Sequence, residues 1–456
     1  MMMLENKKNE KKGRQWIYPK LIKGKLYLYR NIFGWALLAL LFAGPFIRMN
    51  DEQLILFNIL ERKFVFFGII FWPQDFYLFV LAMLIFLVFI VLFTSVFGRI
   101  WCGWACPQTI FMELVFRKIE YWIEGDSNKQ KKLDASRVSL EKVFKKGLKH
   151  LIFLAISFLI ANTFLAYVIS TEELLRIISE PLNQHLTGFI AIVLFTLAFY
   201  GVFAYLREIV CTVICPYGRL QGVLLDNQSM IVGYDYQRGE PRGKIKKEEI
   251  NLHGDCVDCN LCVDVCPTGI DIRKGTQLEC INCTACIDAC DMVMEKTHRP
   301  LRLIGFKSEE EINTGKQFKF GKKLYAYTAV LVVMITVLSV LLIKRTDVET
   351  TLLRAAGTLY QLREDGTVSN LYNAEFINKT NHTIKLDIRP ADPLVKIQYI
   401  QKVALLEKGG STKLTFFISR PQKGIVKYKS EIKLNVLSGA VILEKLETTF
   451  IAPPTL

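Results

Sequence analysis

The residues best suited to chemistry are eight of the chain's twelve cysteines, which fall in two runs of the same spacing, C-x2-C-x2-C-x3-C. Three cysteines this close together can wrap one four-iron, four-sulfur cube. The fourth lies too far along the chain to close the same cube and ligates the partner cube instead. The ligands predicted for the first cluster are Cys256, Cys259, Cys262 and Cys290. The ligands predicted for the second cluster are Cys280, Cys283, Cys286 and Cys266.

Two other uses of clustered cysteines fit this pattern less well. Structural zinc sites usually take two CxxC pairs separated by a longer loop. A disulfide framework requires an oxidising compartment, whereas the flanking segments indicate the cytoplasm, as argued below. The second run is followed by Asp291 where the first is followed by Pro267. Because this proline shields a cluster from solvent, we expect the aspartate to alter the potential of the cluster bound by Cys290.

The other four cysteines form a second repeat, the motif C-x3-C-P, with the pairs Cys102/Cys106 and Cys211/Cys215. On one continuous helix, residues four apart share a face, so each pair could hold one metal ion. Alternatively the proline begins a new helix, and the preceding cysteine then lies at a helix N-terminus, which lowers the pKa of a thiol. Soft thiolates select Cu(I), zinc or iron–sulfur. If the two copies pack as equivalent halves, all four sulfurs converge at the cytoplasmic edge of the membrane.

Long apolar runs define the elements that must position these cysteines. The 456-residue chain is 51% hydrophobic with a mean hydropathy of +0.27, which is too apolar for an ordinary soluble enzyme. A helix of about 20 apolar residues crosses a bilayer. The candidate spans are Ile32–Ile47, Phe76–Phe97, Leu148–Ile169, Leu186–Leu206 and Leu324–Ile343. A shorter run, Phe64–Trp72, is predicted to lie at the interface or to re-enter the membrane.

The distribution of lysine and arginine predicts the orientation. Both accumulate in the N-terminal arm and in residues 99–149 and 207–323, while the connections 48–75 and 170–185 are balanced or acidic. The positive-inside rule then places the clusters in the cytoplasm and the C-terminus outside, in a bacterial inner membrane protein. This bias, together with contact with anionic lipid, explains the formal charge of +15 without any nucleic-acid partner.

After residue 346 cysteine disappears, and short alternating runs are separated by turn signals. The runs are Thr383–Ile388, Val395–Ile400, Leu414–Ile418, Glu431–Val436 and Ala440–Leu446. They predict an all-β sandwich of about 100 residues, immunoglobulin-like in size, outside the membrane.

The predicted fold class is a multidomain membrane protein. It combines an α-helical bundle of about five transmembrane spans, a ferredoxin-like insert with two 4Fe–4S clusters, and a C-terminal immunoglobulin-like β sandwich. The predicted parts are a basic cytoplasmic arm (1–31), spans one to four (32–206) with the first cytoplasmic C-x3-C-P segment (98–147), the second C-x3-C-P segment and a linker (207–249), the ferredoxin-like domain (250–300), a cytoplasmic linker (301–323), span five (324–343) and the periplasmic β domain (346–456).

With WCGWACP, VCTVICP, two ferredoxin-type runs, five spans and an outer β domain in this order, the chain resembles the FixG/RdxA/CcoG family of accessory proteins of cbb-type haem–copper oxidases. The resemblance covers nearly the whole chain. It implies a membrane-bound ferredoxin-like protein that reduces Cu(II) to Cu(I) before copper is delivered to the oxidase. By position it implies that the cysteines from Cys256 to Cys290 hold the clusters. It also implies that copper contacts Cys102, Cys106, Cys211 and Cys215.

The favoured function is therefore cupric reduction. Electrons enter from a cytoplasmic donor or a membrane quinol, pass through both clusters, and reduce copper, a substrate or transient ligand, at the C-x3-C-P thiolates. The expected partners are cbb-type oxidase subunits or copper chaperones. One alternative is a quinol dehydrogenase-type electron-transfer subunit, although the outer domain has no CxxCH motif and no cysteine to carry electrons onward. Another is a non-enzymatic scaffold for oxidase assembly.

Overall fold

The computed structural model describes residues 16–49, 52–59, 63–181, 183–244, 253–315, 322–355, 357, 359–380, 382–400, 405–423, 425 and 427–453. About half of the predicted basic arm and parts of both cytoplasmic linkers lie outside these residues. The chain divides into two compact units, which are described separately. Unit 1 comprises residues 1–43, 84–164 and 177–333, and unit 2 comprises residues 44–83, 165–176 and 334–456.

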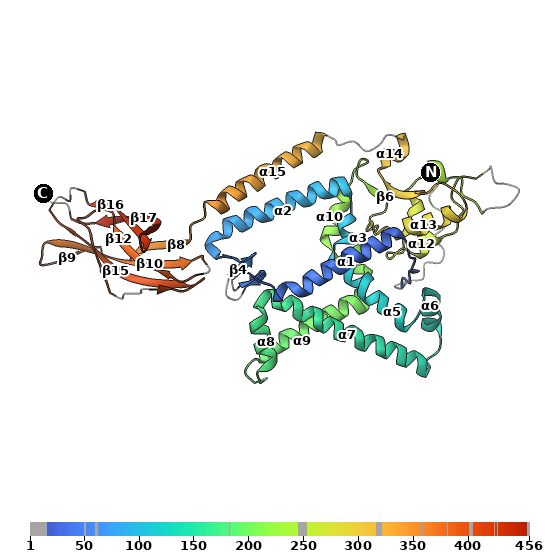
Figure 1. Cartoon of the computed structure of the whole chain (residues 1–456), viewed down its shortest axis with the longest axis horizontal. Coiled ribbons are helices and arrows are strands. Elements are labelled where there is room, and N and C mark those ends of the chain that lie inside the picture. The colour runs from blue at the N-terminus through green and yellow to red at the C-terminus, as the bar shows by residue number, and fades with distance from the viewer. Residues whose placement is uncertain are drawn as a thin grey trace. The chain divides into compact units, whose positions relative to one another are not determined.

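Five helices in the described residues are long and apolar enough to cross a membrane. They are α1 (Lys25–Ala43), α2 (Phe76–Phe97), α7 (Leu140–Ile169), α9 (Leu186–Gly201) and α15 (Lys322–Ile343) (Figure 1). Large apolar side chains on α15, such as Val333 and Ile335, are exposed. Helices that are apolar on all sides and exposed need lipid around them. The protein is therefore a multi-pass membrane protein, as the sequence predicts.

Helix α1 begins at Lys25 rather than at Ile32, because a carboxylate from another segment caps it. The backbone N–H groups of Leu26 and Tyr27 donate to the Asp288 carboxylate at 3.2 and 2.7 Å. The first N–H groups of a helix have no partner within the helix, and a negative charge there is stabilising. The apolar pattern misses this first turn because it carries no information about the distant cap.

Aromatic rings form much of the helix core of unit 1. Phe116 stacks on Phe203 with ring centroids 4.4 Å apart, and meets Phe153 of α7 edge-to-face at 4.8 Å. Phe116 ends the π-helical segment η3 (Phe111–Phe116), and Phe203 lies in the π-helical segment η4 (Val202–Leu206). Such ring pairs add about 0.5–1.5 kcal/mol beyond the burial of their area. They hold η3 and η4 against α7.

Unit 1 also contains short helices and one two-stranded antiparallel sheet among its described residues. The helices are α3 (Ile100–Trp104), α4 (Pro107–Ile110), α5 (Arg117–Ile123), α6 (Ser127–Ala135), the π-helical η5 (Val210–Ile214), α10 (Pro216–Leu224), α11 (Tyr236–Gly239), α12 (Leu261–Asp264), η6 (Ile272–Lys274), α13 (Ala285–Lys296) and α14 (Glu309–Thr314). The sheet pairs β6 (Ile231–Tyr234) with β7 (Ile304–Lys307). Apolar residues of this sheet and of α13 form one core: Val232, Tyr234, Ile287, Met294, Leu303 and Ile304.

Unit 2 contains a small antiparallel sheet that includes the segment predicted to be interfacial or re-entrant. The run Phe64–Trp72 forms β4 (Lys63–Phe66) and β5 (Ile69–Phe71), which pair with each other and, through β4, with β3 (Ile55–Asn58). Val65 of β4 is fully buried within this sheet's own core. Part of the run supplies a protein core, while Phe67 and Ile69 are exposed, and the location of the run at the membrane interface stays a prediction.

Asp75, at the end of the 3-10 segment η2 (Pro73–Asp75), is the centre of a buried ion cluster in unit 2. Its carboxylate lies 2.6 Å from Nη2 of Arg345 and 2.5 Å from Nζ of Lys379. Burial by itself raises the pKa of Asp75, but the hydrogen bonds from both cations outweigh burial, and the pKa is lowered. These ion pairs join Asp75, the residue preceding α2, to the β domain.

The C-terminal region is an immunoglobulin-like sandwich, as the sequence predicts (Figure 1). One sheet has the order β13 (Lys396–Tyr399), β15 (Ser411–Pro421), β10 (Thr367–Asn378) and β8 (Val348–Arg354), with β9 (Gln361–Leu362) beside β10. The other has the order β12 (Asp387–Pro390), β16 (Lys429–Ser438) and β17 (Val441–Ile451). The core between them contains Tyr372, Phe376, Phe416 and Phe450.

Strands β8 and β10 are absent from the sequence prediction. β10 is an interior strand whose even-numbered residues from Val368 to Asn378 are all buried, but two of them, Asn370 and Asn378, are polar and interrupt the apolar residues of that face. Its buried Asn370 is satisfied by main-chain partners, since Nδ2 donates to the Ile451 carbonyl at 2.7 Å. A buried asparagine is stable only with such a partner, which the local sequence does not reveal.

Candidate metal centres

Four cysteines drawn from both runs line one cavity of about 360 Å³: Cys256, Cys259, Cys262 and Cys290. This is the set predicted for the first cluster, and Cys290 reaches it from α13. The rest of the wall is mostly apolar, with Val257, Val293, Met294, Leu303 and Ile304. Four soft thiol donors around an apolar space suit a four-iron cluster.

A second cavity of about 340 Å³ is lined by the set predicted for the second cluster: Cys266, Cys280, Cys283 and Cys286. Cys262 lines both cavities. The two candidate cluster sites are therefore neighbours, as sequential one-electron transfer requires. Isoleucines and Val232 complete much of the second wall.

Both runs wrap their cavities with the same backbone shape. The residue before the second cysteine of each run is left-handed, with φ of 51° at Asp258 and 53° at Asn282. The residue after that cysteine is also left-handed, with φ of 58° at Asn260 and 67° at Thr284. Such conformations cost about 1–3 kcal/mol each for residues other than glycine and concentrate at functional sites. Their repetition at equivalent positions indicates two copies of one ligand-binding loop.

Arg273 places a permanent positive charge on the wall of the first cavity. It is held by Asp271, whose Oδ1 lies 2.8 Å from Nε, and by Asp258, whose Oδ1 lies 2.6 Å from Nη1. Burial raises the pKa of the Cys262 thiol to about 12, and the Arg273 charge opposes this rise. Iron must therefore displace a proton from this thiol when it binds.

The helix α13 explains why Asp291 stands where the first run has a proline. Pro267 follows α12 after that helix has ended, whereas Asp291 lies inside α13, which continues to Lys296. Proline within a helix costs about 3 kcal/mol, because it lacks the N–H and clashes with the preceding turn. The Asp291 carboxylate instead accepts the backbone N–H of Arg302 at 2.8 Å.

In both C-x3-C-P copies the proline begins a new helix. Cys106 is the N-cap residue of α4 and Cys215 is the N-cap residue of α10, each followed by proline in the first turn. The first cysteine of each copy lies on the preceding helical segment, Cys102 on α3 and Cys211 on η5. Of the two predicted geometries, the structure therefore contains the helix N-terminus and not the continuous helix.

The predicted lowering of the thiol pKa is wrong for Cys106. Burial raises its pKa and outweighs the backbone N–H groups of Thr109 and Gln108, which favour the thiolate. Burial also raises the pKa of Cys102 to about 11 and that of Cys211 to about 12. Desolvation decides the protonation state here, because a few N–H dipoles cannot replace the lost hydration of a charge.

The four C-x3-C-P thiols lie close enough to interact. Burial is the main cause of the raised pKa values of Cys102, Cys106 and Cys211, and the proximity of Cys215 adds to the rise of all three. Within the described ranges, however, no three cysteine, histidine, aspartate or glutamate side chains are close enough to hold a single metal ion. A three-ligand copper site is therefore not preformed. A four-iron cube does not need three protein ligands on a single metal ion, since each of its cysteines binds a different iron.

The two C-x3-C-P copies interlock through Gln221, a fully buried residue of α10. Its Oε1 accepts the Cys102 thiol at 3.0 Å and Nε of Arg99 at 3.2 Å. Arg99 also donates to the Leu278 carbonyl, just before the second cysteine run. One arginine thus connects both copies with the second cluster site.

Gly103 allows the first copy to touch that cluster site directly. A Cβ at Gly103 would lie 2.9 Å from the backbone N and Cα of Cys283, and closer still to the Ile281 carbonyl oxygen. Cys102, Ile281 and Cys283 share one buried cluster. The carbonyl of Gly103 accepts Nε of Arg30 at 2.9 Å. The C-x3-C-P backbone is therefore in van der Waals contact with a candidate ligand of the second cluster.

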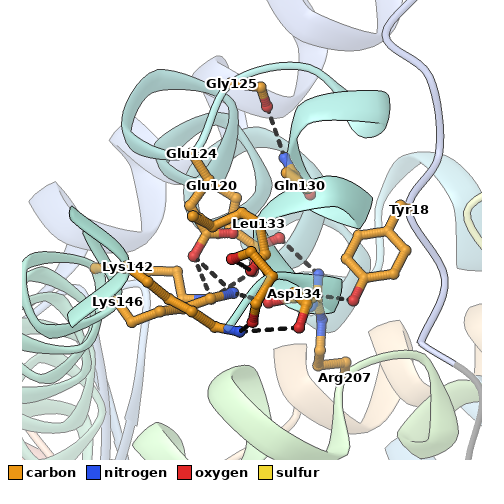
Figure 2. Close-up of polar contacts among 12 residues, drawn as sticks. Tyr18, Glu120, Glu124, Gly125, Gln130, Leu133, Asp134, Lys142, Lys146 and Arg207 are labelled. Carbon is orange, nitrogen blue, oxygen red and sulfur yellow. Dashed lines mark hydrogen bonds and ion pairs between the residues drawn. The ribbon is translucent and has the colours of Figure 1, made fainter. Parts of the chain in front are cut away.

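A buried charged network next to these motifs is absent from the sequence prediction. It includes the buried Arg117, Glu120, Glu124 and Arg207, and the half-buried Glu113 pairs with Arg117. Figure 2 shows Glu120 and Glu124 with Arg207 and with Lys146, which pairs with Glu124. The sequence does carry a signal for this network. After Pro107, charged residues recur every three or four positions among apolar ones, which places them on one face of a helix.

A membrane helix bundle with two adjacent four-cysteine cavities defines a membrane-bound iron–sulfur electron-transfer protein. Family models agree with this class: a 4Fe-4S dicluster domain matches residues 206–309, and a 4Fe-4S binding domain matches residues 79–129. The Ig-like fold at the C-terminus of FixG matches residues 338–453.

Known relatives cover most of the chain. Protein RdxB of Cereibacter sphaeroides is 35% identical over 386 residues, which is 80% of either chain. Protein RdxA of the same organism is 36% identical over 382 residues, which is 79% of either chain. The nitrogen fixation protein FixG of Rhizobium meliloti is 39% identical over 302 residues, which is 64% of this chain and 57% of FixG. The chain belongs to the FixG/RdxA family.

Proposed function

We propose that this protein is a cupric reductase, which transfers single electrons to Cu(II) at the C-x3-C-P thiols during maturation of a cbb-type haem–copper oxidase. The observation that carries the proposal is the backbone contact at Gly103, which joins the copper-binding candidate Cys102 to Cys283 of the second cluster run. Electron transfer across such a contact needs no intervening carrier.

The clusters would be held by the two cysteine sets that line the two cavities. When bound, they supply one-electron chemistry at a potential that the protein adjusts. The chain's own residues exclude water from both cavities with apolar walls. Arg273 adds a fixed positive charge to the first one, and by this route favours its reduced form.

Copper would be the substrate, and thiols suit it because soft ligands select Cu(I) over Cu(II). Each Cu(II) takes up one electron. The thiols of Cys102, Cys106 and Cys211 have raised pKa values, so copper must displace protons to bind. Because three ligands are not preassembled in the described residues, copper would be bound weakly enough to be passed on. A transient site of this kind suits a reductase better than a copper store.

The test uses full-length protein purified anaerobically and reduced with dithionite, followed by removal of dithionite and addition of Cu(II). Cu(I) formation is read with a Cu(I)-specific chelator. Changing Cys102 and Cys211 together to alanine should abolish Cu(I) formation while the iron content stays the same. Val213→Ala is the matched control, since this exposed residue lies between the cysteines of the second copy. An unchanged rate in the double variant would refute the role of these thiols.

A second candidate is a further iron–sulfur cluster at the C-x3-C-P cysteines. It is favoured by the match of residues 79–129, which contain Cys102 and Cys106, to a 4Fe-4S binding domain. Two four-iron clusters require about eight iron atoms per chain and a third requires about twelve. Iron analysis with EPR of intact protein decides between the two candidates.

We also propose that the clusters face the cytoplasm and that the β domain is periplasmic, where it would dock oxidase subunits or copper chaperones. The support is the excess of lysine and arginine in the segments that flank the clusters. Periplasm-specific labelling of cysteines introduced singly into exposed β-domain positions, such as Tyr428, tests this orientation in intact cells.

A further inference from the structure

A third cavity lies next to the second cluster cavity, and most of the residues that line it have no role in the function proposed above. Thr268 and Ile281 line both cavities, so a single layer of side chains separates them. Cys211 of the second C-x3-C-P copy also lines it. A molecule in this cavity would be within direct reach of the electron-transfer centres.

Arg117 gives this cavity a buried charged group that can bind a ligand. Its side chain is 2% exposed and lies on the cavity wall, with Nη1 2.9 Å from Oε1 of Glu113. Its Nε and Nη2 have no hydrogen-bond partner among the residues that the structure describes. A buried charged donor without a partner is expensive, so such donors normally have an acceptor. Glu113 lies in the π-helical η3, and π-helical turns are frequent at functional sites.

The charges of the wall indicate which kind of ligand fits. Two arginines, Arg117 and Arg207, are balanced by two glutamates, Glu113 and Glu208. A balanced wall does not attract an anion or a cation. It suits a neutral molecule that offers an oxygen to the free N–H groups of Arg117 and a hydroxyl hydrogen to a carboxylate. Arg207 directly follows the last residue of the fourth apolar span, so such a molecule can arrive from the lipid.

A chain of ion pairs leads away from the Arg207 side of this wall, and Figure 2 shows most of its members. The successive pairs are Arg207–Glu120 (2.7 Å), Glu120–Lys149 (3.6 Å), Lys149–Glu124 (2.9 Å), Glu124–Lys146 (3.0 Å) and Lys146–Asp134 (2.6 Å). Glu120 and Glu124 are buried, whereas the Asp134 side chain is 32% exposed. Arg207 keeps its proton and acts as a fixed charge, but the carboxylates and lysines from Glu120 to Asp134 form a line of titratable groups that ends at solvent.

We propose that this cavity binds a membrane quinol and that the quinol is the electron donor of the protein. Both O–H bonds of one quinol break, which yields one quinone, two electrons and two protons. The electrons cross the wall formed by Thr268 and Ile281 one at a time. The two protons leave one at a time, first to the Glu113 carboxylate and then along the carboxylates and lysines from Glu120 to Asp134. This inference rests on the proposed function for its final acceptor: two Cu(II) become two Cu(I).

The experiment uses full-length protein with oxidised clusters under anaerobic conditions. Decylubiquinol and 2,3-dimethyl-1,4-naphthoquinol are the probes, and stopped-flow loss of the visible cluster absorbance is the readout. We expect at least one probe to reduce the wild type. Glu113→Gln and Arg117→Lys should slow this by about tenfold or more, the effect of losing one hydrogen bond to a charged group. Glu141→Gln, which breaks an exposed ion pair on α7, is the matched control and should react like the wild type.

A binding measurement supplies a second readout that is independent of electron transfer. A ligand that binds only the folded protein raises its Tm. Decylubiquinone should therefore raise the Tm of the oxidised wild type but not that of Arg117→Lys. The wild-type measurements alone decide the proposal if a variant loses its iron. The proposal would be overturned if neither quinol reduced the wild type. It would also be overturned if Glu113→Gln and Arg117→Lys, with their full iron content, were reduced as fast as the wild type.

Failure of this inference and failure of the proposed function are distinguishable. If protein reduced by dithionite reduces Cu(II) but neither quinol reduces the clusters, the quinol site is wrong and cupric reduction stands. If a quinol reduces the clusters through Glu113 and Arg117 but Cu(II) is not reduced, the quinol site stands and the copper acceptor is wrong.

Discussion

Replacing Gly103 by alanine tests the contact on which the proposed electron route depends. The added Cβ would lie 2.9 Å from the N and Cα atoms of Cys283, and the Ile281 carbonyl is closer still. All three atoms belong to the backbone, so no side-chain rotation relieves the overlap. The C-x3-C-P segment and the second cysteine run must move apart.

Two opposing effects determine the size of the change. Alanine favours the helix α3 over glycine by about 1 kcal/mol. Overpacking a tight contact costs about 1–3 kcal/mol, and the upper end applies here because only backbone can move. The net loss is therefore about 2 kcal/mol. Each kcal/mol lowers Tm by about 2–4 °C in domains of 150–250 residues, so we expect a fall of several degrees.

Thermal unfolding of the full chain, with iron content and EPR of both clusters, measures the effect. Gly147→Ala is the matched control, because Gly147 lies on α7 and nothing is within 4 Å of its Cβ position. There the change should stabilise by about 0.5–1 kcal/mol. Gly103→Ala should also alter the EPR signal of the second cluster and leave that of the first. Equal stability in the Gly103→Ala and Gly147→Ala proteins, with an unchanged second-cluster signal, would refute the reasoning.

Three further predictions concern other parts of the molecule. Asp75→Asn leaves Arg345 and Lys379 with buried, uncompensated charge, and should cost about 3–5 kcal/mol at neutral pH in unfolding of the full chain. Because the folded state lowers the pKa of Asp75, this contribution is complete above about pH 4–5 and is lost as the pH falls through the folded pKa. Wild type and Asp75→Asn should thus converge in acid, and a gap that widens there would contradict the assignment. Cys259→Ser should reduce the iron content from about eight to about four atoms per chain, while full iron retention would exclude Cys259 as a ligand. Arg273→Gln should lower the potential of the first cluster in an EPR redox titration, since it removes a buried positive charge; an unchanged potential would speak against this electrostatic role.

Local patterns predicted much of the architecture correctly. The five spans follow from runs of apolar residues, because a membrane helix needs lipid-compatible side chains on every face. Strands β15 to β17 follow from alternation, because one face of each is buried. Alternation failed for β10, because the buried asparagines Asn370 and Asn378 interrupt the apolar residues of its buried face. The start of α1 was missed because its cap, Asp288, comes from another part of the chain.

For the candidate site, too, the sequence predicted some features correctly and others wrongly. Cysteine spacing was sufficient to predict which thiols share a cavity, because the first three cysteines of a run can follow the surface of one cube and the fourth reaches only the cube of the other run. Spacing could not decide between the two geometries of C-x3-C-P, and it predicted the wrong direction for the pKa of Cys106. Burial determines that pKa, and burial depends on the elements that pack around the thiol.

By itself, the sequence determined the class of this protein: two ferredoxin-type cysteine runs, a repeated C-x3-C-P motif, five apolar spans and a β domain are all short-range patterns. Only the tertiary structure decided that Gly103 touches Cys283 and that two N–H donors of Arg117 lie without a partner in a cavity beside the second cluster site. The physical reason is that these contacts join residues far apart in the chain. Their energies depend on which side chains the fold removes from water together.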